Sequence, residues 1–537
     1  MTDLLASFWY EDWILHALIW LPLVGMAHVV VSSPERAKNL AFAWSSIVFV
    51  LSLGLWWGYE PGGGGFMLES STPWIESWGV SYALGVDGIS VFMVMLTTFT
   101  SAIAILGSFE YVKTRRKAFY ALMLLLETGV LGVFLATDIF LFYVFFELTL
   151  VPMYFIVGIW GGERRIYAAV KFFLYTAVGS LLMLVAILYM YFGGGAESFS
   201  YEAFLNADLG LREQLWLFAA FALAFGIKVP VFPLHTWLPD AHVEAPTPGS
   251  VILAAVLLKM GTYGFMRFLL PFFPGAVQHP TVVAVMLVLG VVGVIYAAWV
   301  AAVQPDAKKL VAYTSVAHMG FVVIGIFALT LNGLQGGMVV MISHGISTAA
   351  LFLLLGMMYE RRHTRLIEDF GGLGRAAPLF ATAFVITALA SIGLPGTSGF
   401  VGEFLALLGT FETHALAAIL AATGVVFAAY YMLPMVQRVL FNKLDKPENR
   451  KFPDLSRREI VILAPMVALM IGIGVHPTPI LERMEPSVQR VLERVEGAGA
   501  ALDSASAGSP DDGPPGYAGD AGPGPQGRVP ATTARED

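Results

Sequence analysis

Six charged residues lie within long apolar stretches, and they are the first sign of chemistry in this sequence. One of them, Arg267, lies near the end of its stretch, from where its side chain is expected to reach the surface. Lys228 and Lys259 fall near the middles of two such stretches, while Glu127, Glu147 and Glu403 fall within three others. A charge at the centre of a membrane-spanning helix costs about 2.5–3.5 kcal/mol on insertion scales, so such groups usually face a bundle interior or a wet cavity. A single pair would serve to staple two helices together, whereas a series of lysines and carboxylates predicts a path for protons.

Histidines at similar depth extend this series. His318 and His344 also lie within apolar stretches, and a neutral imidazole can accept a proton on one nitrogen while releasing one from the other. For each of them, a satisfied core histidine remains the alternative. His235, seven residues after Lys228, completes the candidate set. Together with His242, Asp240 and Glu244 it could suggest a metal site, but the spacing matches no usual ligand pattern.

Prolines interrupt three of the stretches that carry charge. Pro152 follows Glu147, Pro230 and Pro233 follow Lys228, and Pro395 precedes Glu403. Each proline leaves a backbone carbonyl without its helical hydrogen bond. Interrupted helices at membrane depth are tolerated where they line a cavity. We therefore expect hydrated breaks beside Glu147, Lys228 and Glu403.

Composition supplies the elements that must position these residues. Hydrophobic residues make up 57% of the 537, charged residues make up only 13%, and the mean hydropathy is +0.73. Runs of about 20 apolar residues match the length that a helix needs to cross a bilayer. The sequence predicts an all-α polytopic membrane protein with about fourteen spans. We place these near residues 12–31, 38–58, 88–108, 116–136, 138–160, 168–192, 214–239, 248–270, 280–300, 309–330, 337–360, 377–410, 415–441 and 458–475.

Alternate loops between these spans carry most of the basic residues. If the N-terminus lies outside, the loops around Arg36, Lys113, Arg164, Lys308 and Arg361 all face the cytoplasm. This arrangement satisfies the positive-inside rule and predicts that both termini lie outside.

The division of the chain follows from the same pattern. We expect helices 1–3 with an outer loop over residues 1–115, then two five-helix units over 116–270 and 271–441 (helices 4–8 and 9–13). Helices 7 and 12 would be the broken members of an inverted repeat. Residues 442–496 would hold the last span and an interfacial segment, and the Gly- and Pro-rich tail over 497–537 is predicted to be disordered. The glycine-rich stretch 59–87 is expected to be a flexible outer loop.

Several motifs resemble the antiporter-like membrane subunits shared by complex I and Mrp-type cation/proton antiporters. The most specific is FGIKVPVFPLHTWLPDAHVEAPTPGSVILAAVLLKMGTYG, which starts at Phe225. Others are FYVFFELTLVPMYF around Glu147, SVAHMGF around His318, SHGISTAALF around His344 and LPGTSGFVGEF around Glu403. The resemblance covers roughly residues 80–440.

The resemblance implies a role for each charged residue. In such subunits the helix 5 glutamate pairs with the helix 7 lysine, and the helix 8 lysine passes protons toward helix 12, which assigns these roles to Glu147, Lys228, Lys259 and Glu403. Glutamate at position 403 favours the M-type subunit of a proton-pumping NADH:quinone oxidoreductase in a prokaryotic inner membrane. An Mrp-type sodium/proton antiporter subunit is the alternative, and a purely structural membrane scaffold is the third.

Partners and cofactors are implied in the same way. L-type and N-type antiporter-like chains and the lateral helix of the L-type chain would be neighbours in the lipid bilayer, with no nucleic acid involved. The sequence has no cysteine, so it cannot hold a thiolate-ligated iron–sulfur cluster. We expect no cofactor and no redox site in this chain, with NADH, FMN, iron–sulfur clusters and quinone in partner subunits.

Overall fold

The computed structural model describes residue 5, residues 7–62 and residues 65–507, and the side chains up to residue 497. Twelve helices in this part of the chain are long and apolar enough to cross a membrane, which confirms the all-α polytopic prediction. The single-span helices are α2 Tyr10–Val31, α5 Ser90–Gly107, α6 Arg116–Leu135, α9 Arg165–Phe192, α17 Pro280–Ala302, α18 Ala307–Phe327, α19 Leu331–Arg362 and α25 Arg457–Val475.

Other spans consist of consecutive helical pieces. These are α3 Ala37–Ser52 with α4 Leu55–Gly58, α7 Ile139–Leu148 with α8 Leu150–Trp160, the run from α13 to α15 over Thr247–Phe272, and α23 Ala415–Val436 continuing to Phe441. The join between α7 and α8 falls at Thr149, directly after the Leu148 carbonyl that Pro152 leaves free.

Two further segments are divided by non-helical backbone. The segment predicted over 214–239 consists of α11 Leu211–Lys228 and α12 Trp237–Glu244, and the one predicted over 377–410 consists of α21 Pro378–Ser391 and α22 Ser398–Thr413. With these, each of the fourteen predicted segments corresponds to helix. The inverted repeat and the division at residues 115, 270, 441 and 496 stay predictions.

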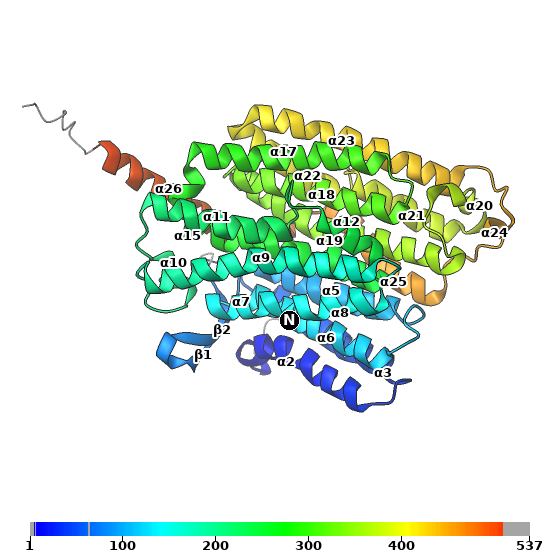
Figure 1. The fold of residues 1–537 in the computed structure, drawn as a ribbon, viewed down its shortest axis with the longest axis horizontal. Coiled ribbons are helices and arrows are strands. Elements are labelled where there is room, and N and C mark those ends of the chain that lie inside the picture. The colour runs from blue at the N-terminus through cyan, green and yellow to red at the C-terminus, as the bar shows by residue number, and fades with distance from the viewer. Residues whose placement is uncertain (1–4, 6, 63–64, 508–537) are drawn as a thin grey trace, which may run out of the picture.

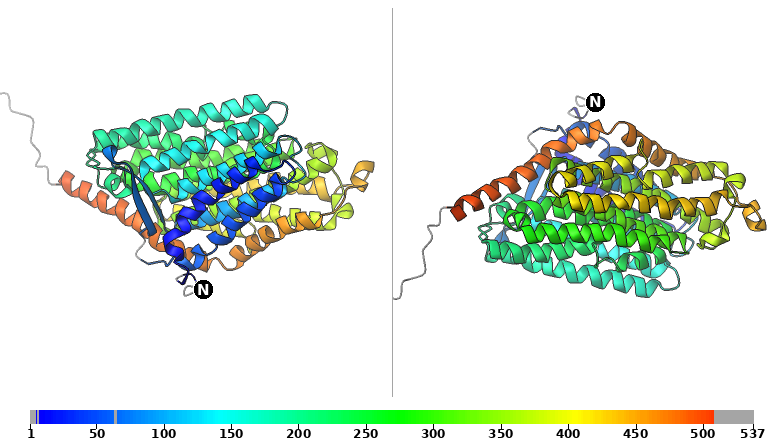
Figure 2. Two further views of the ribbon diagram at one scale, coloured as in Figure 1. Left: turned by 90° about the horizontal axis from the view of Figure 1, so that it is seen from below. Right: turned by 90° about the horizontal axis from the view of Figure 1, so that it is seen from above.

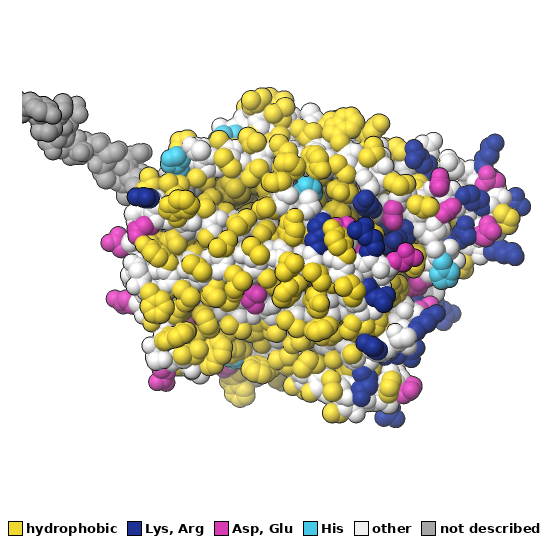
Figure 3. Space-filling view, in the orientation of Figure 1, with side chains coloured by type: hydrophobic (Ala, Val, Ile, Leu, Met, Phe, Trp, Pro, Cys, Tyr) yellow, Lys and Arg dark blue, Asp and Glu magenta, His cyan; other side chains and the backbone are white. Residues whose placement is uncertain are grey.

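The helices run side by side, and the bundle has two unlike ends (Figure 1). Lys and Arg side chains gather at the end that carries α20 Leu373–Ala376 and α24 Pro447–Arg450, which we call the basic end (Figure 3). The opposite end carries two strands, and we call it the hairpin end.

The expectation of a flexible loop over 59–87 is wrong for residues 67–86, while residues 63–64 of that range lie outside the described residues. Strands β1 Met67–Ile75 and β2 Val80–Val86 form an antiparallel hairpin. The turn depends on Gly79, whose positive φ of 65° is readily adopted by glycine. Asp138 fixes the hairpin to the bundle, because its carboxylate accepts from the backbone N–H of Ser81 while also capping α7 at Leu141. The neighbouring glycine run is typical of a loop, whereas the strands themselves contain β-branched and aromatic residues.

The C-terminal segment is also more helical than expected. Helix α26 covers Thr478–Ala507, so helix continues past the boundary predicted at residue 497. It follows α25, and its last turns extend past the other helices at the hairpin end (Figure 2). Residues 508–537 of the predicted disordered tail lie outside the described residues.

Arg267 does not reach the surface, although its place near a helix end predicts that it would. Its side chain is buried and donates to the carboxylate of Asp87, which is also buried. The rings of Phe66, Tyr201 and Tyr263 lie within 6 Å of its guanidinium carbon. The ion pair therefore ties the helical stretch Phe265–Leu269 to the residues just before α5.

Loss of this carboxylate should destabilise the fold. Changing Asp87 to Asn keeps an acceptor for the N–H groups of Ile89 and Ser90 but leaves the charge of Arg267 unpaired, at a cost of about 3–5 kcal/mol. The midpoint of thermal unfolding in detergent should fall clearly. The control is Asp306→Asn, which removes charge from the more exposed pair with Arg365 and should cost less than about 1 kcal/mol. Equal shifts in the two variants would contradict this view of the buried pair.

Candidate functional site

Lys259 and His344 are in direct contact at the centre of the bundle. The Lys259 ammonium lies 2.6 Å from His344 Nδ1 and donates to the carbonyl of Ala254, also at 2.6 Å. Both side chains are buried, with 0% and 3% exposure. Contact at this depth allows a proton to pass between the two nitrogens without water.

The helix around Lys259 is locally widened. Two π-helical stretches, Leu253–Leu257 and Phe265–Leu269, flank the α-helical turn that carries this lysine. A π-helical turn displaces backbone groups from the regular pattern and often marks a functional site. The first stretch presents the Ala254 carbonyl to the ammonium. Nothing in the sequence pattern signals these stretches, because every residue in them is an ordinary apolar helix former apart from Arg267.

The contacts continue from His344 to a carboxylate. The imidazole rings of His344 on α19 and His318 on α18 are 5.5 Å apart between centroids. His318 Nδ1 lies 3.0 Å from Oε1 of Glu403 on α22, and Ser391 Oγ lies 3.5 Å from His318 Nε2. The structure thus brings together Lys259, His344, His318 and Glu403, four of the predicted site residues, from four different helices.

A small cavity opens beside this series. Its volume is about 10 Å³ and its lining includes both histidines and Glu403 together with Ser343, Ser347 and Ser391. A cavity of roughly this size is the minimum that holds one water molecule. Hydroxyl groups around the two rings therefore provide an environment in which a single water can complete the path between them.

Glu147 and Lys228 form a second, looser group. Lys228 ends α11 and is 1% exposed, yet its Nζ has no hydrogen-bond partner among the described residues. It lies 5.0 Å from the ring centre of Phe146 and 5.7 Å from that of Phe172. The Glu147 carboxylate interacts with the lysine electrostatically, but no ion pair within 4.0 Å joins the two. Ser180 of α9 is a hydrogen-bonding neighbour of this carboxylate.

Glycine brings the two lysine-bearing segments together. A Cβ atom at Gly261 would lie 2.7 Å from the Phe225 carbonyl oxygen and 3.0 Å from the Val229 backbone nitrogen. Those two residues flank Lys228, so the end of α11 packs on the turn after Lys259. A backbone approach of this kind requires a residue without a side chain.

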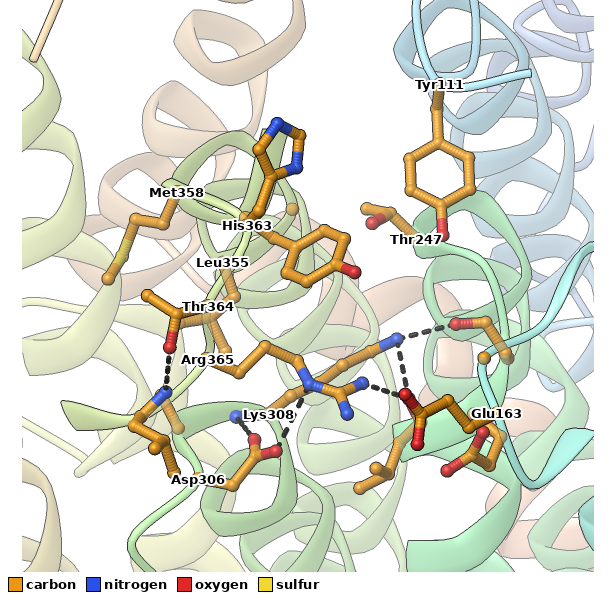
Figure 4. Close-up of a pocket in the computed structure, with 18 of the residues that line it drawn as sticks. Tyr111, Glu163, Thr247, Asp306, Lys308, Leu355, Met358, His363, Thr364 and Arg365 are labelled. Carbon is orange, nitrogen blue, oxygen red and sulfur yellow. Dashed lines mark hydrogen bonds and ion pairs between the residues drawn. The ribbon is translucent and has the colours of Figure 1, made fainter. Parts of the chain in front are cut away.

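A polar cavity lies at the basic end, and its lining residues are drawn in Figure 4. Its volume is about 380 Å³, and Glu163, Asp306, Lys308, His363 and Arg365 are among its lining residues. The Lys308 ammonium donates to the carbonyls of Ala245 and Val243 at 2.6 and 3.4 Å, at the end of α12. The cavity therefore reaches from the surface to the backbone next to His242.

Comparison with known proteins identifies the family. The profile described as NADH:quinone oxidoreductase/Mrp antiporter, TM, matches residues 136–428, more than half of the chain. NADH-quinone oxidoreductase subunit M of Rhodobacter capsulatus is 44% identical over 515 residues, covering 92% of this chain and 99% of that protein. The chain belongs to this family.

Other relatives and solved structures agree with that assignment. NADH-ubiquinone oxidoreductase chain 4 of Marchantia polymorpha is 42% identical, with 92% of this chain and 99% of that protein covered. A chain of respiratory complex I from Thermus thermophilus matches with a TM-score of 0.83 at 33% identity, covering 90% of this chain and 99% of that one. The Mrp complex from Dietzia sp. matches with a TM-score of 0.76, covering 91% of this chain and 56% of that one, but at 21% identity it shows the fold alone.

Two predicted site residues of this family member lie apart from the Lys259–Glu403 series. Glu127 on α6 accepts from Ser45 on α3 at 3.1 Å, and its second oxygen has no partner among the described residues. His235 lies in the break after α11, where its ring stacks on Phe232 and meets Tyr296 edge to face. Their roles stay predictions.

The candidate residues predicted from the sequence do not include His242, which lies closer to the Lys259–Glu403 series than Glu127 and His235 do. This residue is 0% exposed, its ring stacks on Phe352 at 4.6 Å, and both its nitrogens lack partners among the described residues. It interacts electrostatically with Lys259 and Lys308. The sequence gives little signal for it, because residue 242 lies between the spans predicted over 214–239 and 248–270. Within the described residues no cluster of His, Cys, Asp and Glu could hold a metal ion.

Gly393 controls where the Glu403 carboxylate can lie. A Cβ atom at this glycine would approach Oε2 of Glu403 to 2.6 Å, whereas one at Gly396 in the same break would meet nothing within 4 Å. Both glycines have positive φ, 74° and 90°, so alanine at either costs a similar strain of about 1–2 kcal/mol.

Gly393→Ala should therefore displace the carboxylate from His318 while Gly396→Ala leaves it in place. The measurement is the infrared carboxyl band that Glu403→Gln removes, which should shift only in Gly393→Ala. An identical band in both alanine variants would show that Gly393 does not position Glu403.

Proposed function

We propose that this chain is the M-type proton-translocating subunit in the membrane arm of an NADH:quinone oxidoreductase. The observation that carries the proposal is the continuous series from Lys259 through His344 and His318 to Glu403. Each member can take up and release a proton, and each lies within reach of the next. A purely structural link between two helices would need only one pair of charged residues.

Glu147 and Lys228, on the other side of Lys259, control when a proton is released toward this series. A buried lysine retains its proton only while a nearby negative charge offsets the cost of desolvation. Glu147 provides that charge, but at a distance greater than 4.0 Å. A small movement of either side chain, driven by quinone reduction in partner subunits, changes the charge balance at Lys228 and sends its proton toward Lys259.

Protons enter from the basic end, which the positive-inside rule places in the cytoplasm. The polar cavity at this end leads to Lys308, whose ammonium holds the last carbonyls of α12. His242 lies next along α12 and is in electrostatic range of both Lys308 and Lys259. This gives the Lys259 series a supply of protons of its own, and Glu403 is the exit group toward the outside.

The partner subunits include one that covers the break between α11 and α12. Lys171 of α9 donates to Asp240 at 2.8 Å and to the Thr236 carbonyl at 3.0 Å, and both Lys171 and Asp240 retain more than 15% exposure. Lys171 lies six residues inside its helix, about 9 Å from its end. Polar groups exposed at that depth favour a neighbouring helix with polar side chains, as the lateral helix of an L-type chain would provide. NADH, FMN, iron–sulfur clusters and quinone belong to other subunits.

An Mrp-type antiporter subunit is the second candidate. It would use the same series to exchange protons for sodium without redox input. The glutamate at position 403 and its contact with His318 favour the oxidoreductase.

Glu403→Gln should stop proton release in this subunit. The amide cannot carry a proton from His318 outward, so NADH-driven acidification of vesicles should fall strongly and quinone reduction should slow with it, because the two are coupled. Glu403→Asp should retain part of the activity. The matched control is Glu459→Gln, a similarly buried glutamate that pairs with Arg361 outside the series, which should leave both rates near normal. Normal rates in an assembled Glu403→Gln complex would exclude this residue from the path and remove the main reason for preferring an oxidoreductase.

Lys259 should be intolerant even of a conservative change. Lys259→Ala removes both contacts to His344 and Ala254, and Lys259→Arg retains a charge that cannot be released in this pH range. Loss of an acid–base group of this kind typically costs about 100-fold or more in rate. Proton pumping should fall in both variants, measured in reconstituted vesicles with assembly checked on native gels. Wild-type pumping in Lys259→Arg would mean that the residue acts by charge alone.

A further inference from the structure

A wholly apolar crevice opens on the side of the bundle away from the proton path. Its volume is about 530 Å³, larger than the polar cavity at the basic end. Helices α3 and α4 contribute Phe49 and Trp56, α5 and α19 form the floor, and α25 contributes Pro465, Ala468 and Ile473. Ile480 of α26 closes the hairpin end.

The walls of the crevice offer no hydrogen-bonding group to an occupant. They therefore accept hydrocarbon chains or apolar side chains, and the groups at the mouth of the crevice decide between these occupants.

The positively charged side chain of Arg483 lies at the mouth of the crevice. Arg483 follows Ile480 by three residues, which places both on one face of α26, and its guanidinium carbon lies 4.0 Å from the ring centre of Trp56. Its Nη groups make two long hydrogen bonds of 3.4 Å to the carbonyls of Pro479 and Trp56, and its Nε has no partner among the described residues. No carboxylate of the described residues forms an ion pair with it within 4.0 Å.

We propose that this crevice binds the acyl chain of an anionic phospholipid from the leaflet at the hairpin end, with its phosphate group at Arg483. The chain alone gains little by leaving the surrounding lipid, since lipid tails are as apolar as the crevice. Selectivity therefore comes from the guanidinium, whose charge-assisted hydrogen bonds match a phosphate group. The bound lipid fills the space between α3, α25 and α26 and so holds the hairpin-end helix on the bundle. This site is independent of the proposed proton path.

The test uses the complete complex, reconstituted into phosphatidylcholine vesicles with a minor share of phosphatidylglycerol and then re-extracted in mild detergent. Retained lipids are counted by native mass spectrometry. Ala468→Trp fills the crevice, Ala464→Trp places the same bulk one turn away on α25 outside the lining, and Arg483→Gln removes the cation.

The wild type and Ala464→Trp should retain at least one phosphatidylglycerol more than Ala468→Trp. Arg483→Gln should lower the enrichment of phosphatidylglycerol over phosphatidylcholine by about tenfold. If Ala468→Trp does not assemble, the Arg483→Gln comparison decides. Unchanged enrichment in Arg483→Gln, equal retention in both tryptophan variants, or a protein side chain from another subunit cross-linked to Ala468→Cys would each overturn the proposal. Loss of lipid with normal proton pumping would leave the proposed function intact.

Discussion

The interior of a bilayer offers no water, and this single constraint explains both the helices and the site. A buried polar group left without a partner there costs several kcal/mol. Lys259 is stabilised by His344 and the Ala254 carbonyl, and His318 by Glu403 and Ser391. A group that depends on its neighbour for stabilisation is also within reach of that neighbour for proton transfer. The contacts that allow these residues to exist at this depth are thus the contacts of the proposed path.

Small residues set the distances on which that path depends. Gly402 precedes Glu403, and a Cβ atom there would lie 2.5 Å from the backbone nitrogen of Val340. The close approach of α22 to α19 therefore requires glycine at this position. Gly261 does the same between the segments of Lys228 and Lys259. Helices in membranes associate through close packing of small residues, because apolar surface gains little by leaving lipid. Backbone packing, with no help from the hydrophobic effect, therefore determines which charged side chains meet.

The sequence predicts those features of the fold and of the site whose signal lies within a few neighbouring residues. Apolar length located all fourteen helical segments, and proline placed the interruptions beside Glu147, Lys228 and Glu403, since both signals act within a few residues. The hairpin over Met67–Val86 was missed, because its two strands are held by Asp138 from another part of the chain. The contact of Lys259 with His344 and the burial of Arg267 against Asp87 join residues far apart in the sequence. Such pairings follow from helix packing, which a single sequence does not specify.

The two halves of the site differ in how firmly their charged groups are held. Lys259 is already in contact with His344, and His318 with Glu403, so in the proposed path this part needs no large rearrangement to pass a proton. Lys228, in contrast, rests over the rings of Phe146 and Phe172, outside ion-pair distance of Glu147. Aromatic faces stabilise an ammonium by only a few kcal/mol at most. This interaction favours the observed position of the ammonium but leaves only a small barrier to its movement. The cation can therefore move between the rings, the carboxylate and the adjoining turn of Lys259 at low energetic cost. In the proposed mechanism the gate therefore lies at Lys228, where the charge is held weakly.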